Sequence, residues 1–130
     1  GGYHGFSHHG ERERETNALK KIEGYQISMV SYLIDLLRAQ EDPINGGTLF
    51  DHTMILYGCG MATGTHSTRN LPLLLAGGGF RLGEHKACPE EKGRRLPACN
   101  LLLSLLQNFG LEIDRFGTST GTLRGLERRA

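Results

Sequence analysis

The chain has few cysteines, almost no net charge and no long apolar run, and each of these absences excludes a class of protein. Its three cysteines, Cys59, Cys88 and Cys99, are too few for a disulfide-built scaffold. Fifteen basic and fourteen acidic side chains give a net charge of +1, so no overall field attracts a nucleic acid or an anionic membrane. No apolar run approaches the ~20 residues that cross a bilayer. We therefore expect neither a nucleic-acid partner nor a membrane span.

The composition that remains is that of an ordinary globular protein. A chain of 130 residues with 38% hydrophobic side chains normally forms one domain around one core. The chain opens directly on a motif, with no Met before it. We therefore expect residues 1–130 to be a single domain that forms the C-terminal part of a larger α/β domain. The remainder of its own chain is then an expected partner.

Apolar spacing predicts one long helix and two strands. Apolar residues recur at intervals of three and four over residues 16–42, which is typical of a helix, and Pro43 requires that helix to end near Asp42. The short apolar runs TMILYG (53–58) and LPLLLAGGG (71–79) both end in glycine and are typical of buried strands. This alternation predicts an α/β fold with a mostly parallel sheet, whose functional loops follow the strands.

The C-terminal part is predicted to hold one more helix. It opens at Pro97 and ends before Gly110, and its apolar face consists of Leu101, Leu102, Leu105, Leu106 and Phe109. The tail after it has little to bury, so we expect it to wrap the surface and to fray at Arg128 and Arg129. If the protein is exported, a bridge between Cys88 and Cys99 is expected; otherwise both remain free thiols.

The first ten residues, GGYHGFSHHG, place three histidines among four glycines. On a helix, His4 and His8 would share one face and suit a divalent metal such as zinc. The glycines favour a loop instead, and without a third ligand in view exposed surface histidines are the simpler interpretation.

The loop GCGMATGTHSTRN (58–70) follows the clearest strand, at the edge where α/β proteins place ligands. Its polar side chains include Cys59, His66, Ser67, Arg69 and Asn70. Two interpretations remain open: a functional loop, and a glycine-rich turn whose polar groups cap the next segment. A Cys59 nucleophile paired with His66 is a third, weaker one.

Five blocks of the chain, taken in order, resemble the C-terminal half of the bacterial domain-of-unknown-function family 1552. They are SHHG (7–10), GTLFDHTMILYGCGM (47–61), THSTRNLPLLLAGGG (65–79), ACNLLLSLLQNFG (98–110) and FGTSTGTL (116–123). Proteins of that family are mostly exported and are similar in layout to the alkaline-phosphatase and sulfatase superfamily. The resemblance implies a partial alkaline-phosphatase-like three-layer sandwich with a mostly parallel sheet, and a periplasmic or secreted location.

The resemblance also implies a metal-dependent hydrolase of phosphate or sulfate esters. Its divalent metal, zinc or a similar ion, would be held by His4, His8, His9 and His66. The superfamily's first ligand pair maps onto His4 and His8, whereas its Asp–His pair would fall at residues 58–61, where both are absent.

Substrate contacts would come from Ser67, Arg69 and Asn70 of the same loop. The nucleophile would lie in the N-terminal half, so the chain is hydrolase-like only if that half supplies one. The alternative is a degenerate, non-catalytic relative that binds a ligand or a protein at this edge. Convergence of His4, His8 and His66 within coordination distance of one ion would favour the enzyme, and dispersal would favour the binding module.

Overall fold

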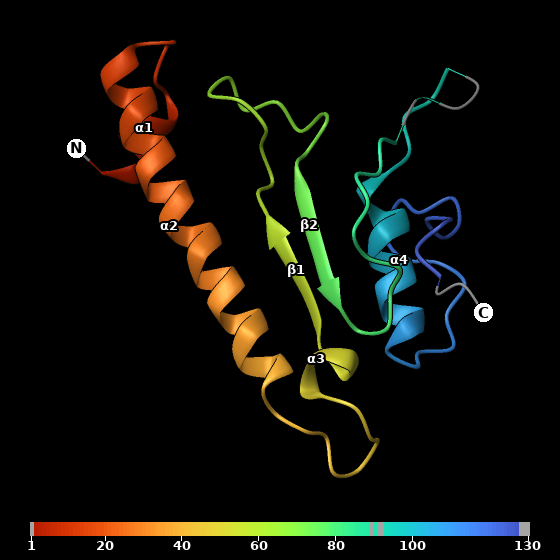
Figure 1. Ribbon diagram of the computed structural model, residues 1–130. Helices are drawn as coiled ribbons and strands as arrows, with labels where there is room; N and C mark the ends of the chain where they lie inside the picture. Colours follow the sequence, from red (N-terminus) through yellow and green to blue (C-terminus); the bar gives the residue numbers. More distant parts are fainter. Residues whose placement is uncertain (1, 89, 91–92, 128–130) are drawn as a thin grey trace. The chain divides into compact units, whose positions relative to one another are not determined.

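The computed structural model describes residues 2–88, 90 and 93–127, and it divides into two compact units, Gly1–Ala76 and Gly77–Ala130. The first, unit 1, contains the helices α1 (Tyr3–Ser7), α2 (Glu13–Arg38) and α3 (Leu49–His52) and the strands β1 (Met54–Gly58) and β2 (Leu73–Gly77), the last residue of β2 being the first of unit 2. Unit 2 contains the helix α4 (Ala98–Asn108) (Figure 1). Each unit is described here by itself.

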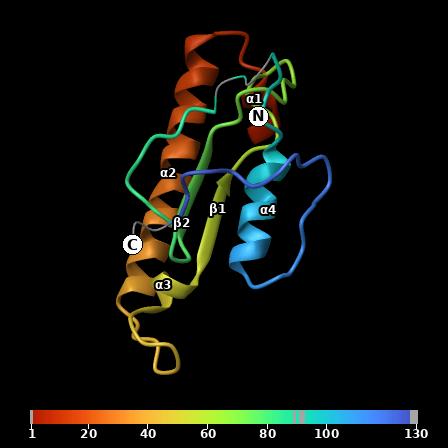
Figure 2. The ribbon, with the colours of Figure 1, turned by 90° about the vertical axis from the view of Figure 1, so that its right-hand side faces the viewer.

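The long helix α2 confirms the prediction from periodicity, with both ends shifted toward the N-terminus. Glu13 and Glu15 lie in its first turn, where carboxylates favour the positive end of the helix dipole. The hydroxyl of Tyr57 in β1 donates to the side-chain carbonyl of Gln26 at 3.0 Å, and α2 runs alongside the strands (Figure 2). In the part of the chain that is described, no helix is both long and apolar enough to cross a membrane.

A closed turn explains why α2 ends at Arg38 rather than near Asp42. Asp42 is buried, and its Oδ1 accepts the backbone N–H groups of Ile44 and Asn45 at 2.9 and 3.0 Å. The backbone N–H of Leu49 donates to the carbonyl of Gln40 at 2.9 Å and closes the turn. Because these bonds fold residues 40–49 into a turn, the helix ends earlier than the apolar spacing predicts.

The prediction of a mostly parallel sheet is wrong, and with it that of a partial alkaline-phosphatase-like three-layer sandwich. The described residues form a two-stranded antiparallel sheet of β1 and β2, whose arrows point in opposite directions (Figure 1). A β-carbon on Gly58 would lie 2.5 Å from the Leu73 side chain and 2.8 Å from the Pro72 carbonyl oxygen, so the end of β1 faces the start of β2. Parallel strands are usually joined by a crossover helix, but the segment 59–72 contains none and turns straight back.

In unit 2 the predicted helix is confirmed as α4, but its predicted apolar face holds only in part. Leu101 is buried as expected, whereas Phe109 is 75% exposed and Leu103, which was not assigned to that face, is 1% exposed. The tail is tied to α4, since the N–H of Leu123 donates to the carbonyl of Asn100 at 3.2 Å. The fraying expected at Arg128 and Arg129 lies outside the described residues.

All three cysteines are described and all are free thiols, so the bridge between Cys88 and Cys99 is absent. Cys99 instead accepts a hydrogen bond at 3.4 Å from the Thr118 hydroxyl. That bond, and then one from the Thr118 backbone, lower the pKa of the Cys99 thiol.

Candidate functional site

The glycine-rich opening forms the short helix α1 rather than the predicted loop. Gly5 inside a helix costs roughly 1 kcal/mol relative to Ala, a penalty that tertiary contacts readily offset. The Tyr3 hydroxyl donates to a carboxylate oxygen of Glu23 at 3.4 Å and ties α1 to α2. Partial burial, and after it the Glu23 carboxylate, raise the pKa of the Tyr3 phenol.

Helical geometry brings His4 and His8 together, because side chains four residues apart lie on the same side of a helix. His8 is the C-terminal capping residue of α1. The two imidazole ring centres lie 4.8 Å apart with their planes at 77°, an edge-to-face arrangement. The four-residue spacing noted in the sequence therefore does bring the two rings together on a helix, and the expected loop is not formed.

A tight turn between the strands carries His66 to the same place. The N–H of Ala62 donates to the carbonyl of Ser67 at 2.7 Å, and the N–H of His66 donates to that of Thr63 at 3.0 Å. His66 has a φ of 63°, in the left-handed region that residues with a β-carbon rarely adopt. Its ring centre lies 4.9 Å from that of His8, again edge to face at 82°.

Gly64 allows this turn to pack against the end of α1. A β-carbon there would lie 2.7 Å from the Ser7 carbonyl oxygen and 3.4 Å from the α-carbon of His8. The close approach of the two backbones therefore requires glycine at this position. The sequence shows Gly64 as one of many loop glycines, so this contact could not be recognised from it.

The three rings are here called the histidine cluster (His4, His8 and His66), in which the ring of His8 contacts each of the other two. Imidazoles on one zinc ion, with Zn–N near 2.1 Å, have ring centres roughly 5 Å apart. As the side chains stand, no three His, Cys, Asp or Glu groups among the described residues are arranged to hold a metal. Turning the ring nitrogens toward a common point requires rotation about the Cβ–Cγ bonds, a broad torsion in histidine. His4 and His66 are exposed and His8 is half-buried.

The remaining residues predicted for the site are placed as follows. The ring of His9 accepts the N–H of Glu11 through Nδ1 at 2.9 Å, and it makes none of the ring contacts of the histidine cluster. Ser67 accepts the N–H of Arg69 at 3.3 Å, and the Arg69 side chain is exposed. Asn70 has a left-handed φ of 54°.

Cys59 is not paired with His66 in the way that the nucleophile hypothesis requires. Its thiol donates to the carbonyl oxygen of Met61 at 2.8 Å. Within the described residues, no hydrogen bond joins Cys59 to His66. In the described part of the chain, His66 is therefore not placed to act as the base for this thiol.

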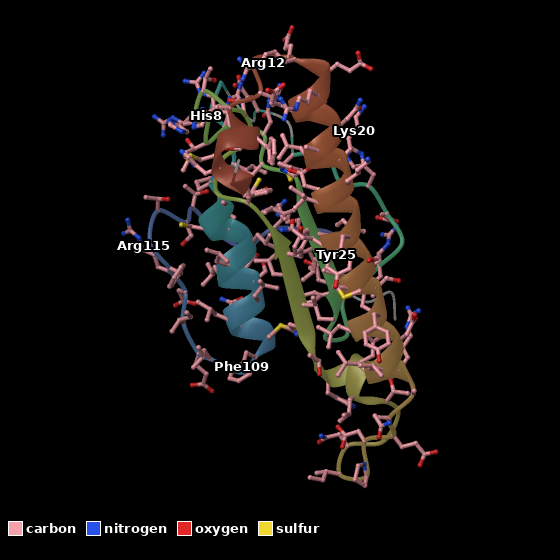
Figure 3. All side chains as sticks on the ribbon, turned by 90° about the vertical axis from the view of Figure 1, so that its left-hand side faces the viewer. His8, Arg12, Lys20, Tyr25, Phe109 and Arg115 are labelled. Carbon is pink, nitrogen blue, oxygen red and sulfur yellow. The ribbon has the colours of Figure 1, made fainter. Side chains whose placement is uncertain are left out.

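The histidine cluster lies at the end of unit 1 where α2 begins. Figure 3 shows His8 and Arg12 at this end, and Arg12 pairs with Glu15 at 3.4 Å. No family model, no curated protein and no solved structure matches the chain. The chemistry of the cluster therefore follows from its own geometry.

Proposed function

We propose that unit 1 binds one divalent transition-metal ion, zinc or a similar ion, through the imidazoles of His4, His8 and His66. The observation that carries this is the pair of ring-centre distances, 4.8 Å between His4 and His8 of the first segment and 4.9 Å between His8 and His66 of the loop 59–72. Neutral imidazole is the commonest protein ligand for such ions. The cluster uses three of the six histidines of the chain.

Three protein ligands favour a catalytic role over a structural one, because a structural zinc site is closed by four. A metal held by these imidazoles would supply Lewis-acid activation of water for hydrolysis. The exposed Arg69 follows His66 on the same loop, and its guanidinium suits the oxyanion of an ester. Ser67 and Asn70 offer further polar groups beside it.

The substrate class proposed is a small phosphate or sulfate ester. This class, and export to the periplasm or the exterior, are carried over from the sequence resemblance to family 1552 alone, and no family model matches the chain. The alternative is a binding module in which the same cluster holds a metal, or a ligand, without turnover.

Calorimetric titration of the whole chain with zinc tests the metal site. We expect one ion per chain, with His8→Ala and His66→Ala each weakening binding by at least about 100-fold, since even changes behind a ligand cost 10- to 100-fold. Binding is expected to weaken in acid, because protonated imidazole cannot ligate a metal. His85→Ala, an exposed histidine of unit 2, is the matched control. Absence of zinc binding by the wild type, or unchanged zinc binding by His66→Ala, would contradict the proposal.

Hydrolysis of nitrophenyl phosphate and nitrophenyl sulfate by the zinc-loaded chain separates the enzyme from the binding module. We expect Arg69→Gln to lower kcat/KM while zinc affinity stays unchanged. Arg115→Gln, another exposed arginine, serves as the control. Tight zinc binding without turnover of either ester would favour the binding module.

A further inference from the structure

Unit 2 contains an open pocket that is formed entirely by its own residues. Its volume is about 450 Å³, within the range of small-molecule sites. The lining combines cationic, hydroxyl, amide, thiol and apolar side chains: Lys86, Ala87, Cys88, Leu96, Asn100, Thr120, Gly121, Thr122, Leu123 and Arg124. Among the described residues of the lining there is no carboxylate.

The charge of the pocket comes from Lys86 and Arg124. The ammonium group of Lys86 lies over Gly125, where a β-carbon would be only 2.6 Å away. The carboxylate beside these cations is Glu127, which accepts the N–H of Gly125 at 2.8 Å. Backbone hydrogen bonds, and then the two cations, lower the pKa of Glu127. Among the described residues, two positive charges therefore face one negative charge.

The hydroxyl-bearing wall of the pocket is held against α4. Asn100 is 3% exposed; its Oδ1 accepts the N–H of Thr120 at 2.9 Å, and its Nδ2 donates to the Thr120 hydroxyl at 3.2 Å. Because that hydroxyl oxygen accepts from Asn100, its own hydrogen can be donated to a ligand. The N–H of Leu123 donates to the Ser104 hydroxyl at 2.8 Å. Because this part of the pocket is already ordered, less conformational entropy is lost when a ligand binds.

We propose that this pocket binds the phosphate group of a small ligand, with Lys86 and Arg124 as the cations and Thr120 and Thr122 as hydroxyl donors. Four donors match the several oxygens of a phosphate better than the two oxygens of a carboxylate. Lysine and arginine are both established phosphate-binding side chains. Leu96 and Leu123 line the same pocket and suit an organic group attached to the phosphate.

Protection of Cys88, which lines the pocket, provides the test. The whole chain is alkylated with iodoacetamide in the presence of inorganic phosphate, phenyl phosphate or benzoate, and each cysteine is followed by peptide mapping. The experiment is run without added metal, so that the site proposed in unit 1 is not loaded. We then expect both phosphates to slow the alkylation of Cys88 but not of Cys59 in unit 1. Tighter protection by phenyl phosphate identifies an organic phosphate as the ligand, and equal protection identifies the free ion.

Charge variants assign the protection to this pocket. Lys86→Gln and Arg124→Gln should each weaken protection about tenfold, the scale of one charge-assisted hydrogen bond. Glu127→Gln should strengthen it, because the competing carboxylate is gone. Arg115→Gln, an arginine outside the lining, should change nothing. No protection by either phosphate, equal protection by benzoate, or protection that survives in the Lys86→Gln/Arg124→Gln double variant would overturn the proposal.

Discussion

At the scale of single residues, Asp42 shows how one carboxylate determines a turn. The side-chain amide of Asn45 donates to its Oδ2 at 2.9 Å, and this bond, followed by the backbone N–H groups of Asn45 and Ile44, lowers the pKa of Asp42. The native state therefore binds the proton more weakly than the unfolded chain does. The stability that Asp42 contributes is fully present above the ordinary carboxyl pKa of 3.8 and is lost as the pH falls through the lowered native value.

We expect Asp42→Asn to lower the thermal midpoint at neutral pH and to make stability fall less steeply below pH ~4 than in the wild type. The amide keeps one acceptor oxygen for the turn but cannot be protonated in this range. Thermal melts from pH 7 to pH 2 measure both effects, with the exposed Asp114→Asn as the control. An NMR titration that returns an ordinary pKa for the Asp42 carboxyl would contradict this account.

At the scale of elements, the contact between α1 and the loop 59–72 depends on Gly64. We expect Gly64→Ala to push the turn away from Ser7, to cost about 1–3 kcal/mol as overpacking does, and to weaken zinc binding by moving His66. Gly60→Ala is the matched control, because a β-carbon there meets nothing within 4 Å. Calorimetry with zinc and thermal melts on both variants measure the difference. Equal zinc affinity in the two variants would show that the position of His66 does not depend on this contact.

At the scale of the whole molecule, α2 has apolar side chains on more than one side. Ile22, Val30, Ile34 and Leu37 are half-buried, whereas another set is exposed to solvent: Tyr25 at 65%, Tyr32 at 58% and Leu36 at 46%. No residue of α2 is fully buried. Large exposed apolar surface favours association.

We expect Tyr25→Lys/Leu36→Lys to reduce the binding of a hydrophobic dye and to improve solubility, with stability changed by less than about 0.5 kcal/mol per site. Val30→Lys, on the half-buried side, should instead destabilise by about 2 kcal/mol, because its charge loses water. Dye fluorescence and denaturant melts distinguish the two variants. Unfolding of the double variant would show that Tyr25 and Leu36 are covered in solution.

The sequence by itself determined the elements that depend on local periodicity. Apolar spacing identified α2 and α4, and short apolar runs ended by glycine identified β1 and β2. The four-residue spacing of His4 and His8 is compatible with a shared helix face. The glycines around them, however, led to the prediction of a loop, whereas the structure has a helix there. Periodicity could not predict the end of α2, because hydrogen bonds to Asp42 end it and they depend on the fold of the following turn.

Only the tertiary structure decided the direction of the strands and the meeting of the histidines. A sequence does not show whether the chain crosses over or turns back after β1, and here the approach of Leu73 to Gly58 makes the sheet antiparallel. The meeting of His66 with His8 depends on a backbone contact at Gly64, between segments more than fifty residues apart in the chain. His9, adjacent to His8, lies outside the cluster because its ring accepts the Glu11 N–H. Such contacts depend on long-range packing, which local residue spacing does not encode.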